Sequence, residues 1–159
     1  MRAVLLVAYL AALFFLPLGF RRREALRIRQ TEEFLLLLRR VKREVACFSR
    51  PLPDICRRAD LPALDAAGFF DALAKNDPAT AFRLTSPALS LPADAAEALD
   101  AFFSGAGSSL KSEELAACEY TVGRLSQILE REKKDGAARV RLRSTLTLTG
   151  GLLFLLLVL

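Results

Sequence analysis

The chain of 159 residues contains no histidine, and it therefore lacks the side chain that most often serves as general acid or base near neutral pH. It also contains no tryptophan and only three cysteines, Cys47, Cys56 and Cys118. The cysteines lie 9 and 62 residues apart, a spacing that fits neither a zinc site nor a disulfide framework, so we interpret them as reduced core thiols. We expect a protein that is not an enzyme and that uses no metal, no cofactor and no small-molecule substrate.

Carboxylates offer the alternative of a lipid-modifying enzyme. Such an enzyme needs acidic side chains that converge in a pocket, and Asp54, Asp60 and Asp65 are the candidates. Their spacing is not that of a metal-binding loop. We interpret them as solvated helix ends.

The excess of basic residues is typical of proteins that bind nucleic acid, since the net charge is +5 and the pI is about 9.5. Residues 21–143 hold Tyr120 as their one tyrosine, and aromatic residues do not alternate with basic ones as in proteins that stack bases. The charge also varies along the chain: +6 over residues 21–50, −4 over 51–110 and +2 over 111–143. We expect that the protein binds no nucleic acid, and we attribute the positive charge of these segments to a nearby membrane.

The N-terminal segment has no charged residue from position 3 to position 20. Eighteen helical residues span roughly 27 Å, close to the hydrocarbon thickness of a bilayer. A cleaved signal peptide is the alternative, but only Arg2 precedes the run and no small-x-small cleavage site follows it. We therefore predict a transmembrane helix over residues 1–20.

The C-terminal segment, residues 144–159, is also without charge and would extend about 24 Å as a helix. A soluble domain of this size has no core able to surround such a helix on every side. We predict a second transmembrane helix there. The small residues Ala8, Ala11, Ala12, Gly150 and Gly151 would let the two membrane helices approach closely, or Gly150 and Gly151 would only add flexibility towards lipid.

Arginines lie just inside both apolar runs. They are Arg21, Arg22 and Arg23 at one end and Arg139, Arg141 and Arg143 at the other. Because arginine and lysine near membrane helices stay on the cytoplasmic side, residues 21–143 should be a cytosolic domain of a two-pass protein in the cell membrane. The same arginines could contact anionic lipid headgroups of the bilayer.

The cytosolic segment has helical periodicity and no convincing strand pattern, so the predicted fold class is all-α: a cytosolic helical bundle between two terminal transmembrane helices. The membrane helix could run on into the first helix of this segment with at most a bend, since neither Gly nor Pro occurs between Gly19 and Pro51, and the sequence leaves open whether the two are continuous. The predicted core stripe of this first helix is Phe34, Leu37, Leu38, Val41, Val45 and Phe48.

Prolines divide the middle of the segment into short helices that begin near Pro53, Leu64, Pro78 and Pro92. The second of these, over residues 63–76, should bury Leu64, Ala67, Phe70 and either Leu73 or Ala74. The fourth should bury Ala95, Leu99, Phe102 and Phe103.

The stretch "GAGSSLKSEE" predicts the start of a long helix. Gly107 permits a turn, Ser108 or Ser109 is the N-cap, and Glu113 and Glu114 suit the positive end of the helix dipole. The core stripe of this helix should be Leu115, Cys118, Val122, Leu125, Ile128 and Leu129. Gly136 should weaken the helix, or form a loop.

The order of these motifs resembles the stage III sporulation protein AB family, which is similar to the F component of type II secretion systems. Four stretches carry the resemblance: "IRQTEEFLLLLRRVKREVACFSRPLPDI" with its pairs Glu44-Val45 and Pro51-Leu52, "FFDALAKNDPATAF", "FFSGAGSSLKSEE" and the apolar end "TLTGGLLFLLLVL".

The resemblance implies a non-enzymatic membrane scaffold of a secretion-like channel between mother cell and forespore, in the mother-cell-derived membrane around the forespore. It also implies contacts with other channel subunits and with a secretion-type ATPase. The turn formed by Gly107, Ser108, Ser109 and Glu114 would then be either a helix cap or a partner contact. The alternative is a platform subunit of a type II secretion or pilus-like machine outside sporulation.

Overall fold

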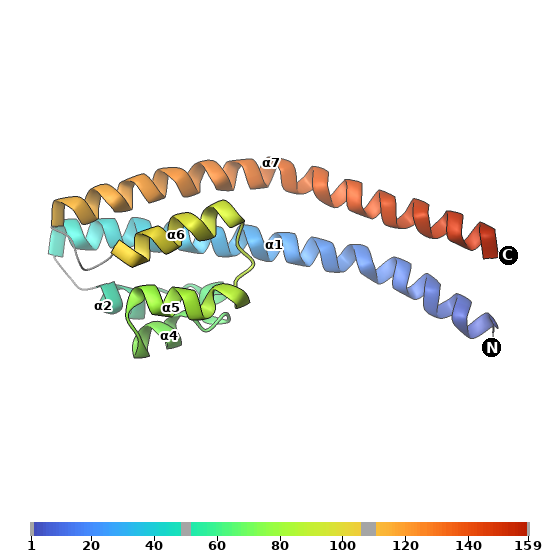
Figure 1. Cartoon of the computed structure of the whole chain (residues 1–159), viewed down its shortest axis with the longest axis horizontal. Coiled ribbons are helices and arrows are strands. Elements are labelled where there is room, and N and C mark those ends of the chain that lie inside the picture. The colour runs from blue at the N-terminus through green and yellow to red at the C-terminus, as the bar shows by residue number, and fades with distance from the viewer. Residues whose placement is uncertain (1, 49–51, 106–110, 159) are drawn as a thin grey trace. The chain divides into compact units, whose positions relative to one another are not determined.

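The computed structural model describes residues 2–48, 52–105 and 111–158 (Figure 1). Within these ranges every regular element is a helix, which confirms the all-α class. In chain order the helices are α1 (Arg2–Phe48), α2 (Leu52–Arg57), α3 (Pro62–Asp65), α4 (Phe69–Lys75), α5 (Pro78–Thr85), the short 3-10 helix η1 (Ser86–Ala88), α6 (Ala93–Gly105) and α7 (Lys111–Val158).

The chain forms two compact units. Unit 1 consists of Met1–Ala25 and Glu132–Leu159, and unit 2 is Leu26–Arg131. Unit 2 is narrower than the predicted domain 21–143, because residues 21–25 and 132–143 group with the terminal segments. The boundaries 1–20, 21–143 and 144–159 are not tested by this grouping and stay predictions.

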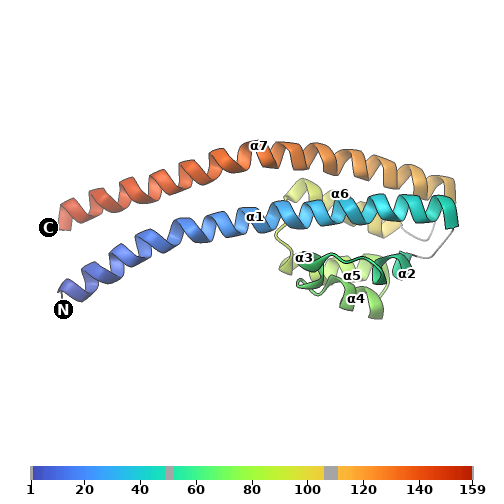
Figure 2. The same cartoon turned by 180° about the vertical axis from the view of Figure 1, so that it is seen from behind.

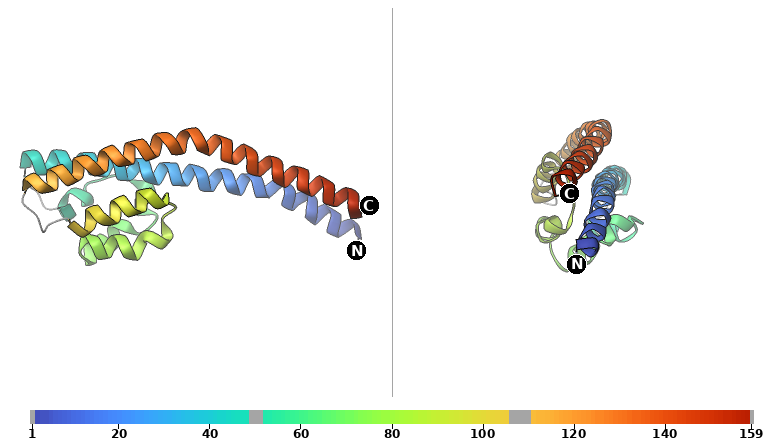
Figure 3. Two further views of the ribbon diagram at one scale, coloured as in Figure 1. Left: turned by 45° about the horizontal axis from the view of Figure 1, so that its top comes forward. Right: turned by 90° about the vertical axis from the view of Figure 1, so that its right-hand side faces the viewer.

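Unit 1 is a pair of helical segments, one from α1 and one from α7. They run antiparallel and side by side, so that the N- and C-terminal ends of the chain lie at the same end of the pair (Figures 1 and 3). Among the residues whose side chains are described, we find no helix with the length and apolarity needed to cross a bilayer. The side chains of residues 2–18 and 151–158, on which the two predicted transmembrane helices depend, lie outside that set, and this part of the prediction is not confirmed.

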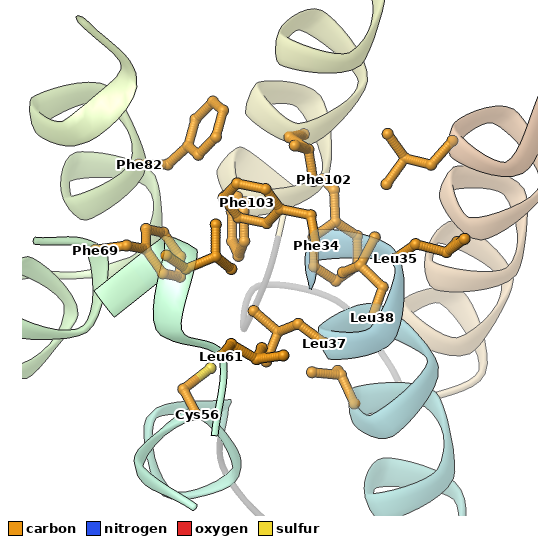
Figure 4. Close-up of a cluster of buried hydrophobic side chains, with 14 of the residues drawn as sticks. Phe34, Leu35, Leu37, Leu38, Cys56, Leu61, Phe69, Phe82, Phe102 and Phe103 are labelled. Carbon is orange, nitrogen blue, oxygen red and sulfur yellow. The ribbon is translucent and has the colours of Figure 1, made fainter. Parts of the chain in front are cut away.

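Unit 2 packs its short helices and α6 against the adjoining parts of α1 and α7 (Figures 1 and 2). Its centre is the ring of Phe34 on α1, which makes edge contacts with Phe69, Phe82 and Phe103 at centroid distances of 5.3, 5.9 and 6.3 Å (Figure 4). All four rings are at most 2% exposed. One aromatic side chain of α1 therefore joins α4, α5 and α6 in a single core.

The predicted core stripes of the two long helices are confirmed. On α1, Phe34, Leu37, Leu38 and Val41 are buried and Val45 is partly buried, while the side chain of Phe48 is not described. On α7 the buried residues are Cys118, Leu125, Ile128 and Leu129; Val122 is partly buried, and Leu115 is intermediate in exposure. The fourth short helix, α6, buries the predicted Ala95, Leu99, Phe102 and Phe103.

The single helix predicted over residues 63–76 was wrong. A turn at residues 66–68 separates α3 from α4, and Gly68 adopts a φ of 77°, a backbone conformation that favours glycine. The break turns α4 onto a new axis, so that Phe69 is fully buried and Phe70 only partly. Ala74 is exposed and Leu73 is buried.

Helix α5 begins as the sequence predicts, with Pro78 in its first turn. Its N-cap is Asp77, whose side chain accepts a hydrogen bond from the backbone N–H of Thr80 at 2.9 Å. That hydrogen bond lowers the pKa of the Asp77 carboxyl below its usual value.

Candidate functional site

A charged cluster joins the two helical segments of unit 1. Nη2 of Arg139 on α7 donates to Oε2 of Glu132 at 2.6 Å and to Oε1 of Glu24 on α1 at 2.9 Å. The side chains of Glu132 and Glu24 are 5% and 14% exposed, and that of Arg139 is 34% exposed. Hydrogen bonding to Glu132, and then to Glu24, raises the pKa of Arg139 against the opposing effect of desolvation, so the guanidinium stays charged.

Gly136 lies one turn before Arg139 and makes this arrangement possible. A Cβ placed on Gly136 would lie 3.0 Å from Oε1 of Glu24, the oxygen that also accepts from Arg139. A side chain at this position would therefore press on the Glu24 carboxylate, which would have to shift by a few tenths of an ångström. Of the two alternatives for Gly136, the loop was wrong, because α7 continues through this residue, which is buried.

In unit 2 a buried carboxylate serves as a helix cap supplied from another helix. Glu33 on α1 is 6% exposed, and its Oε2 accepts hydrogen bonds from the backbone N–H groups of Ala63 and Leu64 at 2.8 and 2.9 Å. Leu61, the N-cap residue of α3, makes no side-chain capping bond, so Glu33 takes over that role. Arg29 provides a further charge, with its Nε 3.3 Å from Oε1 of Glu33.

A second buried polar side chain of α1 makes a similar long-range bond. Oε1 of Gln30, which is 2% exposed, accepts from the backbone N–H of Ser90 at 2.7 Å. Sequence reasoning missed both residues. The available signal was that Gln30 and Glu33 continue the buried side of α1 towards the N-terminus at helical spacing from Leu37, where an unpartnered polar group would be costly.

The two described thiols are structural. Cys56 and Cys118 are free and buried. Burial raises the pKa of Cys56 to about 12 and that of Cys118 to about 11, so neither is a thiolate at neutral pH. Cys118 Sγ also donates to the backbone carbonyl of Leu38 at 3.2 Å. This confirms the interpretation as reduced core thiols for these two residues, while the side chain of Cys47 lies outside the described set.

The three carboxylates of the alternative enzyme hypothesis lie in the described part of unit 2. Asp54, Asp60 and Asp65 are all exposed. Among the described residues no group of three or more Cys, Asp and Glu side chains is arranged to hold a metal ion.

The family model of stage III sporulation protein AB matches residues 2–159 of the chain. The chain belongs to the stage III sporulation protein AB family. No curated protein and no solved structure matches it significantly. Membership of the sporulation protein AB family implies a role in sporulation.

The six predicted boundary arginines lie in different surroundings. Arg21, Arg22 and Arg23 are exposed on α1. Arg139 is held in the charged cluster of unit 1, whereas Arg141 is exposed and also has an interaction partner. The side chain of Arg143 is not described. Arg139 therefore joins two helices through its ion pairs, whereas the three arginines of α1 are exposed.

The remaining predicted residues lie mostly outside the described set. Gly107, Ser108 and Ser109 fall in the undescribed segment 106–110, and the side chains of Ala8, Ala11, Ala12 and Gly151 are likewise not described. Glu114 lies in the first turn of α7 and has an interaction partner. Gly150 is exposed, and a Cβ added there would meet no described atom within 4 Å.

Proposed function

We propose that this sporulation protein is a non-enzymatic membrane scaffold of a secretion-like channel between mother cell and forespore. The family match over residues 2–159 is the observation that carries the proposal. The similarity to the F component of type II secretion systems belongs to the proposal as well. In a secretion machine of that type, we expect a small membrane-attached helical bundle to hold other subunits in place.

The proposed topology is a membrane hairpin. The uncharged residues 3–20 and 144–159 would each cross the mother-cell-derived membrane around the forespore, and residues 21–143 would face the cytosol. The antiparallel pair in unit 1 is compatible with this, because both chain ends lie at the same end of the pair (Figure 3). Arg21, Arg22 and Arg23 would lie at the membrane boundary with their guanidinium groups in water or among headgroups.

Topology reporters inserted after Gly107 in the full chain test this hairpin. We expect a cytosolic signal in the wild type and a mixed signal when Arg21, Arg22, Arg23, Arg139, Arg141 and Arg143 are all replaced by glutamine. Replacing the same number of arginines inside unit 2 is the control and should leave the signal cytosolic. Protease digestion of residues 21–143 from outside intact cells would contradict the proposed orientation.

The scaffold role without catalysis is supported by the state of the reactive side chains. The described thiols are buried and protonated, and Arg139 of unit 1 is committed to two carboxylates. Hydrolysis of phospholipid or of phosphate esters by the purified full chain, lost on substitution of Asp60 or Asp65, would overturn this part of the proposal.

The partner contacts of the scaffold would involve exposed apolar side chains of unit 2. Tyr120 on α7 is 67% exposed and Leu84 on α5 is 62% exposed. Tyrosine is enriched among residues that dominate protein interfaces. We propose that one of these side chains contacts the secretion-type ATPase of the channel, and that other channel subunits bind in or next to the membrane.

Crosslinking in sporulating cells tests the ATPase contact. A photo-crosslinker placed at position 120 or 84 should yield an adduct with the secretion-type ATPase of the same host, and Tyr120→Ser or Leu84→Ser should weaken co-purification of that ATPase. Leu142, which is 63% exposed in unit 1, is a matched position for the crosslinker outside unit 2. Adducts at none of the unit 2 positions would refute the proposed contact.

A further inference from the structure

Three consecutive arginines of unit 1 spread around α1. The next residue, Glu24, faces α7, because its Oε1 accepts a hydrogen bond from Nη2 of Arg139 at 2.9 Å. Successive residues of a helix are about 100° apart, so Arg21, Arg22 and Arg23 point to other sides of α1 than Glu24 does. All three are exposed, and their side chains make no ion pair or hydrogen bond within the described ranges.

The three arginines lie at the level of the charged cluster along the helix pair. They precede Glu24 by one to three residues, which is about 1.5 to 4.5 Å along the axis of α1. Since the two segments of unit 1 run antiparallel (Figure 3), residues before Glu24 on α1 lie beside residues after Gly136 on α7. Arg21, Arg22 and Arg23 are therefore beside the part of α7 that leads to Arg141.

The exposed surface of unit 1 changes from charged to uncharged at this level. Before Gly136, the exposed residues of α7 are Lys133, Lys134 and Asp135. Arg141 is exposed, and after it the exposed residues with described side chains are all uncharged: Leu142, Thr145, Leu146, Thr149 and Gly150. On α1 the residues before Arg21 are uncharged as far as position 3. The exposed cations thus lie next to an uncharged surface on both helices.

The exposed charge of unit 1 is mostly of one sign. Among its described residues the exposed cations are Arg21, Arg22, Arg23, Lys133, Lys134 and Arg141, and Asp135 is the one exposed acid. The other acids, Glu24 and Glu132, accept hydrogen bonds from Arg139 and are 14% and 5% exposed. Phosphate is therefore the group that this level of the helix pair would attract.

We propose that Arg21, Arg22 and Arg23 bind the phosphate groups of anionic phospholipids. This inference rests on the proposed membrane hairpin and assigns the partner of its boundary arginines. A phospholipid carries its phosphate next to its acyl chains, and unit 1 presents cations next to an uncharged surface on which Leu142 and Leu146 are 63% and 64% exposed. Nucleic acid would match the cations but has no acyl chain for the leucines. Arg139 contributes little, since two carboxylates already hold its guanidinium.

The full chain in bilayers of phosphatidylcholine tests this contact. A spin-labelled probe lipid, either phosphatidylglycerol or phosphatidylcholine, reports the fraction of lipid that the protein immobilises. We expect the anionic probe to associate about fivefold more strongly than the neutral one at low salt, and this ratio to fall as added salt screens the charges. Replacing Arg21, Arg22 and Arg23 by glutamine should lower the ratio to about two or less, whereas lysine at the same positions should preserve it, because the positive charge is kept.

Two controls make the test specific. Arg39→Gln, Arg43→Gln and Lys75→Gln together remove three exposed cations of unit 2, the same change of charge, and should leave the ratio unchanged. Inorganic phosphate added at constant ionic strength should not displace the anionic probe, because free phosphate has no acyl chain beside the leucines. Displacement would assign the three arginines to free phosphate and overturn the lipid contact.

Alkaline extraction of the same vesicles separates this inference from the proposed hairpin. A chain that resists extraction but associates equally with both probes would overturn the lipid contact and leave the hairpin standing. A preference that the three glutamines leave unchanged, or that the unit 2 control loses, would also overturn the contact. Release of the chain by alkali would overturn the hairpin, and this inference with it.

Discussion

We expect Glu33→Ala to destabilise unit 2 by about 3 kcal/mol, although alanine is the better helix former in α1. In the wild type the Glu33 carboxylate accepts hydrogen bonds from the backbone N–H groups of Ala63 and Leu64. Truncation leaves the N–H of Ala63 buried without an acceptor, at a cost of about 1 to 3 kcal/mol. The N–H of Leu64 also donates to the backbone carbonyl of Leu61 at 3.2 Å, so it loses one of two bonds, at a cost of about 1 kcal/mol more. The ion pair with Arg29 adds little to this sum, because that arginine is 61% exposed.

Urea unfolding of the fragment 21–143, which contains all of unit 2, measures the loss. With a slope of about 1.5 kcal/mol/M, a change of about 3 kcal/mol lowers the unfolding midpoint by about 2 M. Glu33→Gln should fall between wild type and alanine, because one amide oxygen can still accept a hydrogen bond but the charge is gone.

Glu97→Ala is the control for this experiment. Glu97 is 78% exposed and its carboxylate lies 3.9 Å from Arg124, so its removal should change the stability by less than about 0.5 kcal/mol. A Glu33→Ala fragment whose midpoint lies within about 0.3 M of the wild type would refute the capping role. The same fragment would then show that α3 does not need an acceptor from α1.

Other parts of the structure lead to further expectations. Leu125→Asp should unfold the fragment 21–143, because Leu125 is 0% exposed and an unpaired carboxylate in its place costs more than about 4 kcal/mol. Gly136→Val in the full chain should displace Glu24 and speed amide hydrogen exchange over residues 132–143, since even a Cβ would come within 3.0 Å of its Oε1. Because the pKa of Asp77 is lower in the folded state, its contribution to stability is present at neutral pH and is lost as pH falls below about 4, and Asp77→Asn should remove this part of the pH dependence.

Matched substitutions on the same helix serve as controls. Gln127→Asp places the same carboxylate on the exposed side of α7 and should leave the melting curve nearly unchanged. Gly123→Val adds the same side chain where no described atom lies within 4 Å of the new Cβ. Equal effects of Leu125→Asp and Gln127→Asp would contradict the assigned core face, and equal exchange in the two glycine variants would contradict the close approach at Gly136.

The periodicity of the long helices was sufficient to predict their buried faces. On α1 the step from Phe34 to Leu38 and Val41, and on α7 the step from Leu125 to Ile128, follow the 3.6-residue repeat, and all five residues are buried. Such a stripe is a local property of the helix, because an apolar face must find a partner whatever that partner is. The start of α5 was predictable for a similar reason, since proline favours the first turn, and α6 begins one residue after Pro92.

The same periodicity failed where the backbone leaves the helix. The pattern from Leu64 to Leu73 could be drawn on one helix, but the positive φ at Gly68 begins a new one and exchanges Phe70 for Phe69 in the core. A glycine permits that conformation without requiring it. The packing of Phe69 against Phe34 on α1 favours the break at Gly68 over one continuous helix, and this contact joins residues far apart in the sequence.

The contacts of charged residues were the least predictable part of the candidate site. Arg139 was predicted to be a boundary arginine from its neighbours in the sequence, which gave no sign that its guanidinium lies between Glu24 and Glu132. Glu33 was counted as one acid in a basic segment, although it caps a helix 30 residues away. Composition gives the number of such charges, whereas their partners depend on which helix faces lie opposite each other.

The amino-acid sequence by itself determined the helical class, the apolar sides of the long helices and, through the order of its motifs, the sporulation protein AB family. These properties follow from spacing and residue type along one stretch of chain. Only the tertiary structure decided that Gly136 admits the carboxylate of Glu24, that Glu33 caps α3 and that Phe34 joins three helices. Each of these is a contact between residues distant in the sequence, and such contacts exist only after the chain has folded on itself.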